Sequence, residues 1–288
     1  MIAAAVVGLA AGCSRGPTSS SRISSGVEPG TTPTSAAPVT TTTAAPTTVA
    51  STTPTTAARP APVVTTAPTT TAVHAATVTA CPTNLASDLA STGSARQLIT
   101  VESSGYGTSN ATVELWQKSG SCWTSAGGPY PSLIGSAGFS DHKSEGDHST
   151  PTGLFGVGPV MYGNAPDPGV HEPYHVLVCG DWWDEDPGSA GYNTFQHVSC
   201  GRTPPFGGAS EALWTETAQY PSFAVIDYNT GPVVRGAGSA IFFHADDGSA
   251  TVVCVSVPRG DLDAALDWID PAQAPAFVMG PASEITSF

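Results

Sequence analysis

The feature that most constrains the fold is a stretch from about Ser14 to Val78 that consists almost entirely of Thr, Ala, Pro, Ser and Gly. It contains no Trp, Tyr or Phe, so it cannot bury enough apolar surface to offset the entropy lost on ordering. Every aromatic residue lies after it, which leaves roughly 210 residues to fold, a usual size for one domain. We therefore expect a signal segment (1–13), a disordered linker (14–78) and one folded domain (79–288).

The expected domain is strongly acidic. Of the 23 acidic side chains 22 lie beyond residue 78, against only six of the nine basic ones. Such a charge repels phosphates, which argues against nucleic acid and against anionic membrane surfaces as partners. A cationic or zwitterionic partner is easier to accommodate. The plainer interpretation is that an acidic surface keeps an exported protein soluble.

The N-terminus contains a short apolar run, Ile2 to Ala11, that is too short to span a bilayer and fits a signal peptide. It leads into Leu9-Ala10-Ala11-Gly12-Cys13, which resembles the lipobox of bacterial lipoproteins. The resemblance implies lipidation of Cys13 and a place at the outer face of the cytoplasmic membrane; the alternative is a plain secretory signal. We expect a monomer whose only membrane contact is the lipid, with the Pro-rich linker as an extended tether.

The chain has six cysteines, which in an exported protein are either paired or specialised. If Cys13 carries the lipid, five remain, an odd number. The most economical pairing joins Cys81 to Cys122 and Cys179 to Cys200 and leaves Cys254 free, although other pairings stay open. There is no CxxC and no zinc-finger spacing, and we expect neither a metal nor a cofactor.

After Cys81 the sequence is typical of short strands separated by Gly, Pro, Ser and Asp. The predicted strands are 97–102, 111–118, 153–160, 175–179, 222–227, 239–245 and 251–257. A helix is predicted over 260–269, where Leu262, Leu266 and Ile269 share a face and Pro271 stops it; a weaker helix is predicted over 210–219. The expected class is mainly β, a barrel or sandwich with one or two short helices.

A histidine and a cysteine stand out near the C-terminus. His244 follows an apolar strand, and Cys254 lies on the next predicted strand after a turn at 246–250. We interpret the two as a β-hairpin that places them on adjacent strands. A thiolate attacks carbonyl carbons, a neighbouring imidazole can take its proton, and backbone N–H groups hold the oxyanion. The competing interpretation is a small buried thiol beside a structural histidine.

Several motifs agree in order with one enzyme family. Residues 238–271 resemble the C-terminal part of the L,D-transpeptidase catalytic domain, in the branch of secreted proteins of high-GC Gram-positive bacteria. The resemblance is carried by Gly238-Ser239-Ala240-Ile241-Phe242-Phe243-His244, by Thr251 to Pro258 and by Trp268-Ile269-Asp270-Pro271. Upstream, residues 143–155, 181–183, 192–195 and 223–229 also fit it.

The resemblance implies an L,D-transpeptidase-like β-fold and a cysteine acyltransferase. Family enzymes cut the peptide bond before the terminal D-alanine of a peptidoglycan stem tetrapeptide and form a thioester. An amine of a second stem resolves it into a crosslink between diamino-acid residues, and water would make the enzyme a carboxypeptidase. By position, Cys254 would be the nucleophile, His244 the base and Thr251 an orienting residue. The backbone of Val253 and Cys254 would supply the oxyanion donors.

Two positions depart from the family pattern. Val253 stands where the family has Gly before the nucleophile, and Ser256 stands where Arg or Asn is frequent. Glycine permits close backbone approach and a positive φ, which a β-branched residue resists. The second hypothesis is therefore a non-catalytic or weakly active peptidoglycan-binding envelope lipoprotein on the same scaffold.

Other clusters of polar residues are weaker candidates. Asp141, His142, Asp147 and His148 have residue types that bind zinc or manganese, but they lie in a Ser/Gly/Glu-rich segment without helical register. We interpret them as a solvated loop. The acidic run 184–186 is interpreted as a surface feature or a loose calcium site, and no carboxylate pair stands out for a glycosidase.

Overall fold

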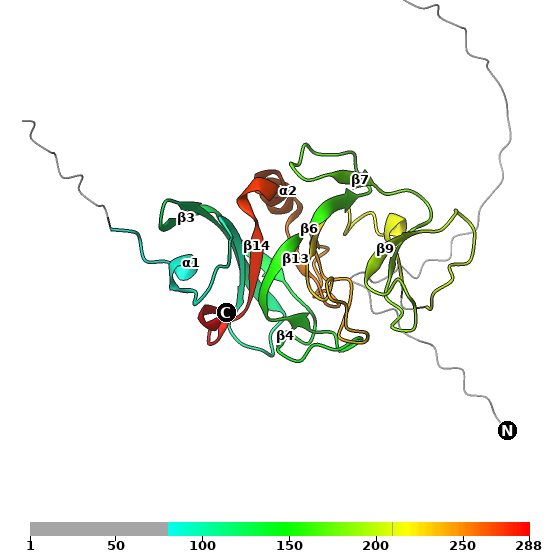
Figure 1. The fold of residues 1–288 in the computed structure, drawn as a ribbon, viewed down its shortest axis with the longest axis horizontal. Coiled ribbons are helices and arrows are strands. Elements are labelled where there is room, and N and C mark those ends of the chain that lie inside the picture. Colours follow the sequence, from blue (N-terminus) through cyan, green and yellow to red (C-terminus); the bar gives the residue numbers. More distant parts are fainter. Residues whose placement is uncertain (1–79, 209) are drawn as a thin grey trace, which may run out of the picture. The chain divides into compact units, whose positions relative to one another are not determined.

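The computed structural model describes residues 80–208 and 210–288. The predictions for the signal segment, for Cys13 and for the 14–78 linker lie outside the described residues. The described chain is mainly β with two α-helices (Figure 1), which confirms the predicted class. None of its helices has the length and hydrophobicity to cross a bilayer.

The main sheet has nine strands and closes on itself. Their order is β11-β12-β13-β3-β2-β1-β14-β6-β7, and β11 also pairs with β6. Eight strands therefore form a closed barrel, and β7 continues the sheet beside β6. The strands are β1 (Gln97–Ser103), β2 (Asn110–Ser119), β3 (Cys122–Leu133), β6 (Gly153–Gly163), β7 (Tyr174–Val176), β11 (Phe223–Ile226), β12 (Phe242–Ala245), β13 (Val255–Val257) and β14 (Ala276–Pro281).

Smaller elements lie around this barrel. A three-stranded sheet has the order β10-β8-β9, and β4 pairs with β5. The bounds are β4 (Phe139–Ser140), β5 (Thr150–Pro151), β8 (Asp181–Asp184), β9 (Thr194–His197) and β10 (Glu211–Ala212). The helices are α1 (Leu85–Asp88) and α2 (Arg259–Trp268), with 3-10 turns η1 (Leu213–Thr215), η2 (Pro271–Gln273) and η3 (Ile285–Ser287).

Strands β1 and β14 are buried on both faces, because two apolar cores flank them, and β2 contributes residues to both cores. One face contributes Ile99, Val113 and Phe277 to the large core. The opposite face contributes Leu98 and Val278 to a second core under α1 and η3. Alternation along each strand separates the two sets, as the pleat of a strand requires.

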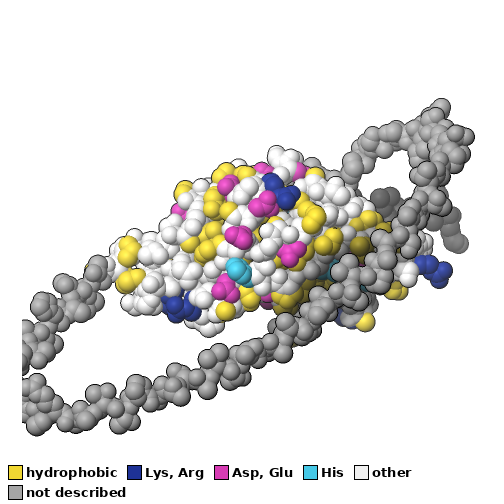
Figure 2. All heavy atoms as spheres, turned by 90° about the horizontal axis from the view of Figure 1, so that it is seen from above, with side chains coloured by type: hydrophobic (Ala, Val, Ile, Leu, Met, Phe, Trp, Pro, Cys, Tyr) yellow, Lys and Arg dark blue, Asp and Glu magenta, His cyan; other side chains and the backbone are white. Residues whose placement is uncertain are grey.

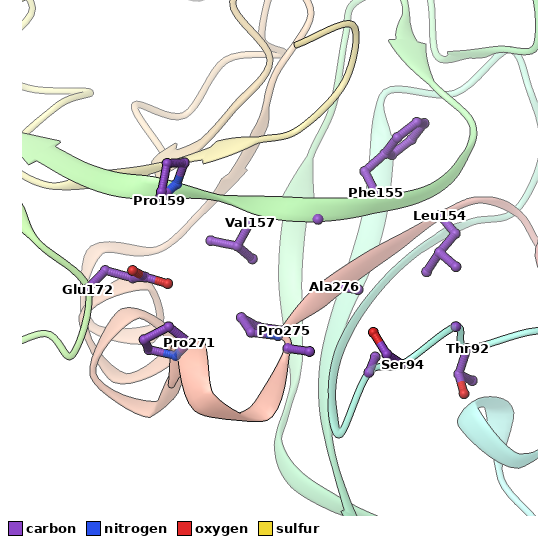
Figure 3. A pocket seen from close by; sticks show the side chains of 14 residues that line it. Thr92, Ser94, Leu154, Phe155, Val157, Pro159, Glu172, Pro271, Pro275 and Ala276 are labelled. Carbon is purple, nitrogen blue, oxygen red and sulfur yellow. The ribbon is translucent and has the colours of Figure 1, made fainter. Parts of the chain in front are cut away.

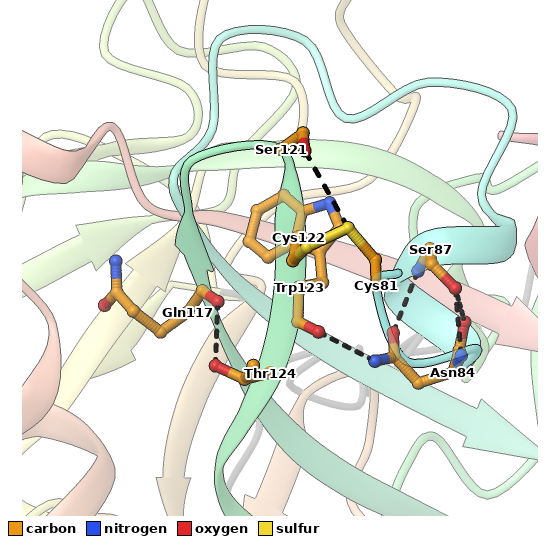
Figure 4. The surroundings of a disulfide bond; sticks show 8 residues. All are labelled: Cys81, Asn84, Ser87, Gln117, Ser121, Cys122, Trp123 and Thr124. Atoms are coloured by element: carbon orange, nitrogen blue, oxygen red, sulfur yellow. Dashed lines mark hydrogen bonds between the residues drawn. A yellow bond between two sulfur atoms is a disulfide. The ribbon is translucent and has the colours of Figure 1, made fainter. Parts of the chain in front are cut away.

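Both predicted local disulfides are present. Cys81 is bonded to Cys122 and Cys179 to Cys200. The first bond ties the start of the domain to the start of β3, beside the capping contacts of α1 (Figure 4), where Asn84 donates to the Trp123 carbonyl oxygen at 2.9 Å. The sequence prediction is confirmed for these two pairs.

Two helix predictions had different outcomes. Helix α2 confirms the prediction for 260–269, and its Leu262, Ala265 and Leu266 are buried against the barrel. The predicted helix at 210–219 is wrong: the chain there forms β10 and the single turn η1. Glu211 pairs with β8, and this tertiary strand pairing overrides a weak local helix preference.

Strand β3 was not predicted, because Gly127, Gly128, Pro129 and Pro131 interrupt its pattern. The structure shows why glycine is needed there. The β2–β3 ladder changes register twice near Leu115, and a Cβ on Gly128 would lie 2.6 Å from the Val113 carbonyl oxygen. The glycine pair therefore allows a bulged strand rather than ending it.

The predicted hairpin of β12 and β13 is wrong. The two strands are adjacent but parallel, with Phe243 opposite Val255 and His244 opposite Ser256. Residues 246–254 thus cross over instead of making a tight turn. Both strands are fully buried, as is usual for parallel strands. The sequence there lacks the alternation of apolar and polar residues that is typical of an antiparallel hairpin with one exposed face.

Candidate functional site

The side chains of β12 alternate between the inside of the barrel and the three-stranded sheet outside it. Phe243 packs edge-on against Phe277 at 5.5 Å between ring centroids, inside the barrel. Phe242 points the other way, onto Trp183 of the three-stranded sheet at 5.0 Å. His244 shares the side of Phe242 by alternation, and its ring meets Tyr220 edge-on at 5.5 Å. His244 therefore lies between the barrel wall and the elements that cover it.

The register brings Cys254 to the same face. Because Phe243 pairs with Val255, the preceding Cys254 is level with Phe242. The Phe242 N–H donates to the Cys254 sulfur at 3.2 Å, and the Ala240 carbonyl oxygen lies 3.2 Å from that sulfur. His244 and Cys254 are diagonal neighbours across adjacent segments, although the strands run parallel.

The Cys254 sulfur is fully buried. No cysteine among the described residues is free, so the expectation that Cys254 is left as a free thiol is wrong for this structure. The count of cysteines left other pairings open, and the sequence alone could not choose among them.

The ring of His244 is held in a defined tautomer. Its Nδ1 lies 2.8 Å from the Ala245 carbonyl oxygen, which can only accept, so Nδ1 carries the hydrogen. Nε2 then has a lone pair, and it has no hydrogen-bond partner within the described chain. Burial lowers the pKa of His244 to about 4, against the opposing effect of the Ala245 carbonyl. The imidazole is thus neutral near pH 7 and available as a base, but neither of its nitrogens is hydrogen-bonded to Cys254.

Two threonine hydroxyls fix the backbone at the candidate nucleophile. Thr251 Oγ1 donates to the Cys254 carbonyl oxygen at 2.7 Å. Thr150 Oγ1 accepts from the Gly135 N–H at 2.9 Å and donates to the Val253 carbonyl oxygen at 2.8 Å. Both threonines are buried, and the carbonyl oxygens at 253 and 254 accept hydrogen bonds from these fixed hydroxyl donors. The orienting role expected for Thr251 stays a prediction.

Val253 is accommodated without strain. Its φ is not positive, since it is absent from the non-glycine residues of the described chain that have such a conformation. Its side chain is 1% exposed and belongs to the large core. The Val253 N–H makes no hydrogen bond among the described residues, so a backbone donor is still available where the resemblance places the oxyanion.

A buried asparagine supports the strand that leads to His244. Asn193 Oδ1 accepts from the Trp183 indole N–H at 2.9 Å and from the Ala240 N–H at 3.0 Å. Ala240 has a φ of 53°, a conformation that costs a non-glycine residue about 1 kcal/mol or more. The hydrogen bond from its N–H helps to keep that turn next to the Cys254 sulfur.

The weaker candidates have other partners. Asp141 accepts from Tyr106 and Thr152, and Asp147 forms an ion pair with Lys143 at 2.6 Å. The described residues contain no group of His, Cys, Asp or Glu side chains arranged to hold a metal ion. The interpretation of run 184–186 as a surface feature is wrong for its first two members: Asp184 and Glu185 are fully buried.

The acidic surface is separate from these buried groups. Acidic side chains are scattered over the face shown in Figure 2 and do not gather in one patch there. The interpretation that surface charge keeps the domain soluble stays a prediction.

A cavity of about 570 Å³ lies elsewhere, between β6 and the segment that enters β14. Its lining is largely apolar, with Leu154 and Phe155 at one end and the single carboxylate, Glu172, near Pro271 at the other (Figure 3). It contains neither His244 nor Cys254. A smaller cavity of about 170 Å³ is lined by Trp183 and Asn193 and therefore lies nearer to the candidate site.

Several residues at the site were not assigned a role from sequence. Thr150 and Asn193 lie within segments that carry the family resemblance, so that signal was present but did not indicate what either side chain does. Tyr220 gave no signal, and Glu185 was noted only as part of the acidic run 184–186, because only the fold shows that both side chains are buried. Comparison of the chain with protein-family models, with curated proteins and with solved structures found no match.

Proposed function

We propose that this domain is a cysteine acyltransferase of the L,D-transpeptidase kind, acting on peptidoglycan stem tetrapeptides. The observation that carries the proposal is the ring of His244. Its Nδ1–H is fixed on the Ala245 carbonyl, and its unpartnered Nε2 lies on the face that also carries Cys254. A neutral imidazole in this tautomer is what a general base for a thiol requires.

The proposed reaction has two steps. His244 Nε2 takes the proton of the Cys254 thiol while the sulfur attacks the carbonyl carbon before the terminal D-alanine. The C–N bond breaks, the D-alanine amine leaves with that proton, and a thioester remains. An amine of a second stem then attacks the thioester and releases the thiol. The Phe242 N–H stabilises the thiolate, and the Val253 N–H is the candidate donor to the oxyanion.

The proposed location is the cell envelope, at the outer face of the cytoplasmic membrane or secreted. Disulfides persist in oxidising compartments outside the cytosol, and the two bonds of the described domain support that location. The membrane anchor would be the lipid on Cys13.

A second candidate is favoured by a specific observation. Cys254 and His244 are 0% and 2% exposed, and Cys254 is not a free thiol in the structure. A stem peptide cannot reach a sulfur in this state. The domain would then be a peptidoglycan-binding envelope lipoprotein that keeps the scaffold of the enzyme without its turnover.

Intact-mass spectrometry with a carbapenem separates the two functions. The purified protein is incubated with the drug with and without a reductant, because a thiol is needed for acylation, and peptide mapping locates any adduct. We expect one adduct on Cys254 under reducing conditions and none in Cys254→Ala. In His244→Gln the adduct should form about 10² to 10⁴ times more slowly, the usual contribution of a general base.

Three results would count for the binding protein instead. These are no adduct on the reduced protein, an adduct on another cysteine only, or equal acylation rates with and without His244. The last result would leave a reactive thiol but no catalytic pair.

A further inference from the structure

The cavity of about 570 Å³ beside β14 is formed by three segments that are far apart in the sequence. Residues 154–157 and 159 of β6 line one side, and residues 271 and 274–276, at the entry to β14, line another. Residues 92–95 lie at one end (Figure 3). Sites for small organic ligands usually have about 300 to 1,000 Å³. The cavity therefore has room for a ligand, and the candidate catalytic residues are not part of it.

Most of the lining is apolar, and much of it is rigid. Leu154 and Val157 contribute methyl groups from β6, and three prolines complete the apolar walls: Pro159, Pro271 and Pro275 (Figure 3). A proline ring fixes φ and has almost no side-chain entropy to lose. Walls of this kind are ordered before a ligand arrives, which favours binding of an apolar group.

One charged side chain points into this apolar space. Glu172, in the loop between β6 and β7, is only 8% exposed, and its carboxylate is directed between Val157 and Pro271 (Figure 3). Within the described chain this carboxylate accepts no hydrogen bond and forms no ion pair. Buried polar groups in native proteins are almost always hydrogen-bonded. Here the space beside the carboxylate is a cavity, so a donor can come from a ligand.

The electrostatic surroundings of Glu172 favour a cation. Burial first, and then the carboxylate of Asp270, raise the pKa of Glu172. Asp270 accepts from the Ala272 N–H, which is a neutral donor. None of the described residues that line the cavity is Lys, Arg or His. A positive charge beside Glu172 would offset the cost of burying its carboxylate and the repulsion from Asp270.

The two ends of the cavity differ in charge. Glu172 is at the end near Pro271, whereas the end near Leu154 carries only the neutral hydroxyls of Thr92 and Ser94 (Figure 3). This asymmetry fits an organic cation whose charge is at one end. It does not fit a metal ion, because calcium takes six to eight oxygen ligands and the described residues contain no group of acidic side chains that could hold one.

We propose that this cavity binds a small organic cation, a ligand with a primary ammonium group on an apolar body. The ammonium group donates to the carboxylate of Glu172, and the apolar body lies against Leu154, Val157 and the prolines. Charge-assisted hydrogen bonds of this type are about twice as strong as neutral ones. The site needs no reaction at Cys254, so it goes beyond the proposed function and does not depend on it.

The test compares 4-phenylbutylamine with 4-phenylbutan-1-ol, in which a hydroxyl replaces the ammonium group on the same apolar chain. Dissociation constants for the full-length protein are measured at pH 7 by isothermal titration calorimetry. We expect the amine to bind about tenfold or more tightly than the alcohol. Glu172→Gln should remove that preference, because it keeps the shape of the side chain and removes its charge. Glu284→Gln removes an exposed charge outside the cavity lining and should keep it.

Two results would overturn the site: equal affinity for the amine and the alcohol, or a preference for the amine that persists in Glu172→Gln. A lysine peptide, acetyl-Ala-Lys-Leu-amide, that bound more tightly than the amine would indicate a polypeptide partner and would also overturn the proposal. If Glu172→Gln does not fold, NMR of the unmodified protein with the amine decides. NOE contacts from the phenyl ring to the methyl groups of Leu154 and Val157 would support the site, and their absence would refute it.

Discussion

Strand β8 and the residue after it carry three fully buried carboxylates, Asp181, Asp184 and Glu185, and the first and last of them are in opposite circumstances. Asp181 accepts from His175 at 2.8 Å, from His197 at 2.7 Å and from the Val178 N–H at 2.8 Å. Glu185, four positions later, accepts from no group of the described chain. Both side chains are 0% exposed, so burial alone does not distinguish them; their partners do.

The pKa of each carboxyl shows the same contrast. Burial raises the pKa of Asp181, but the hydrogen bonds from His197, Val178 and His175 outweigh it, and the pKa is lowered. For Glu185 burial and the neighbouring acids act together and raise the pKa. A buried acid with donors stabilises the fold, whereas one without donors costs stability.

The largest effect is expected for Asp181→Asn. The amide removes the charge that three donors share, and the unfolding free energy should fall by about 3 kcal/mol near pH 7, since hydrogen bonds to charged groups contribute about 1.5 to 3 kcal/mol each. Because the folded pKa is lowered, this stability is present above the unfolded value of about 3.9 and is lost as the pH falls through the folded pKa. Urea unfolding at pH 7 and pH 3 measures both.

Asp267 provides the control for that change. It is exposed on α2, and Asp267→Asn should alter the unfolding free energy by less than about 0.5 kcal/mol. An Asp181→Asn protein as stable as this control would mean that the Asp181 hydrogen bonds contribute nothing net.

Glu185→Gln is expected to act in the opposite direction. Removing an unpartnered buried charge should raise the unfolding free energy at pH 7 by about 1 kcal/mol. Because the folded pKa is raised, the native protein loses stability as the pH rises above the unfolded value of about 4.3, until the folded pKa is reached. The gain should therefore shrink toward zero at pH 4, and a gain that is the same at both pH values would refute this account.

The smallest change in unfolding free energy is expected for an ion pair that is exposed to solvent. Arg259 and Asp263 on α2 lie 2.8 Å apart, with side chains 46% and 38% exposed. Asp263→Asn should cost about 0.3 kcal/mol, as is usual for i,i+4 pairs in water, and 0.5 M salt should remove the difference. If Asp263→Asn lost as much unfolding free energy as Asp181→Asn, hydrogen bonds to a buried carboxylate would not contribute more stability than those to an exposed one.

The sequence predicted those parts of the fold whose signal is local. Alternation in residues 111–118 predicted β2, the spacing of Leu262 and Leu266 predicted α2, and sequence proximity predicted both disulfides. Where burial is two-sided, the prediction failed, because β12 and β13 have no alternation and their parallel direction depends on the barrel closing around them. Strand β3 failed for a related reason, since its glycines make sense only against the bulged ladder with β2.

The candidate site divides in the same way. The sequence by itself determined that the chain is mainly β and acidic, and it singled out His244 and Cys254 by residue type and by family resemblance. Only the tertiary structure decided that these two share a face on parallel segments, that His244 keeps an unpartnered Nε2, that Cys254 is not a free thiol and that Glu185 is buried without donors. The physical reason is that burial, tautomer and hydrogen-bond partners depend on groups that are far apart in the sequence. Tyr220 and His244 are one such pair, and Glu211 and Glu185 are another. The members of each pair meet only when the three-stranded sheet packs on the barrel.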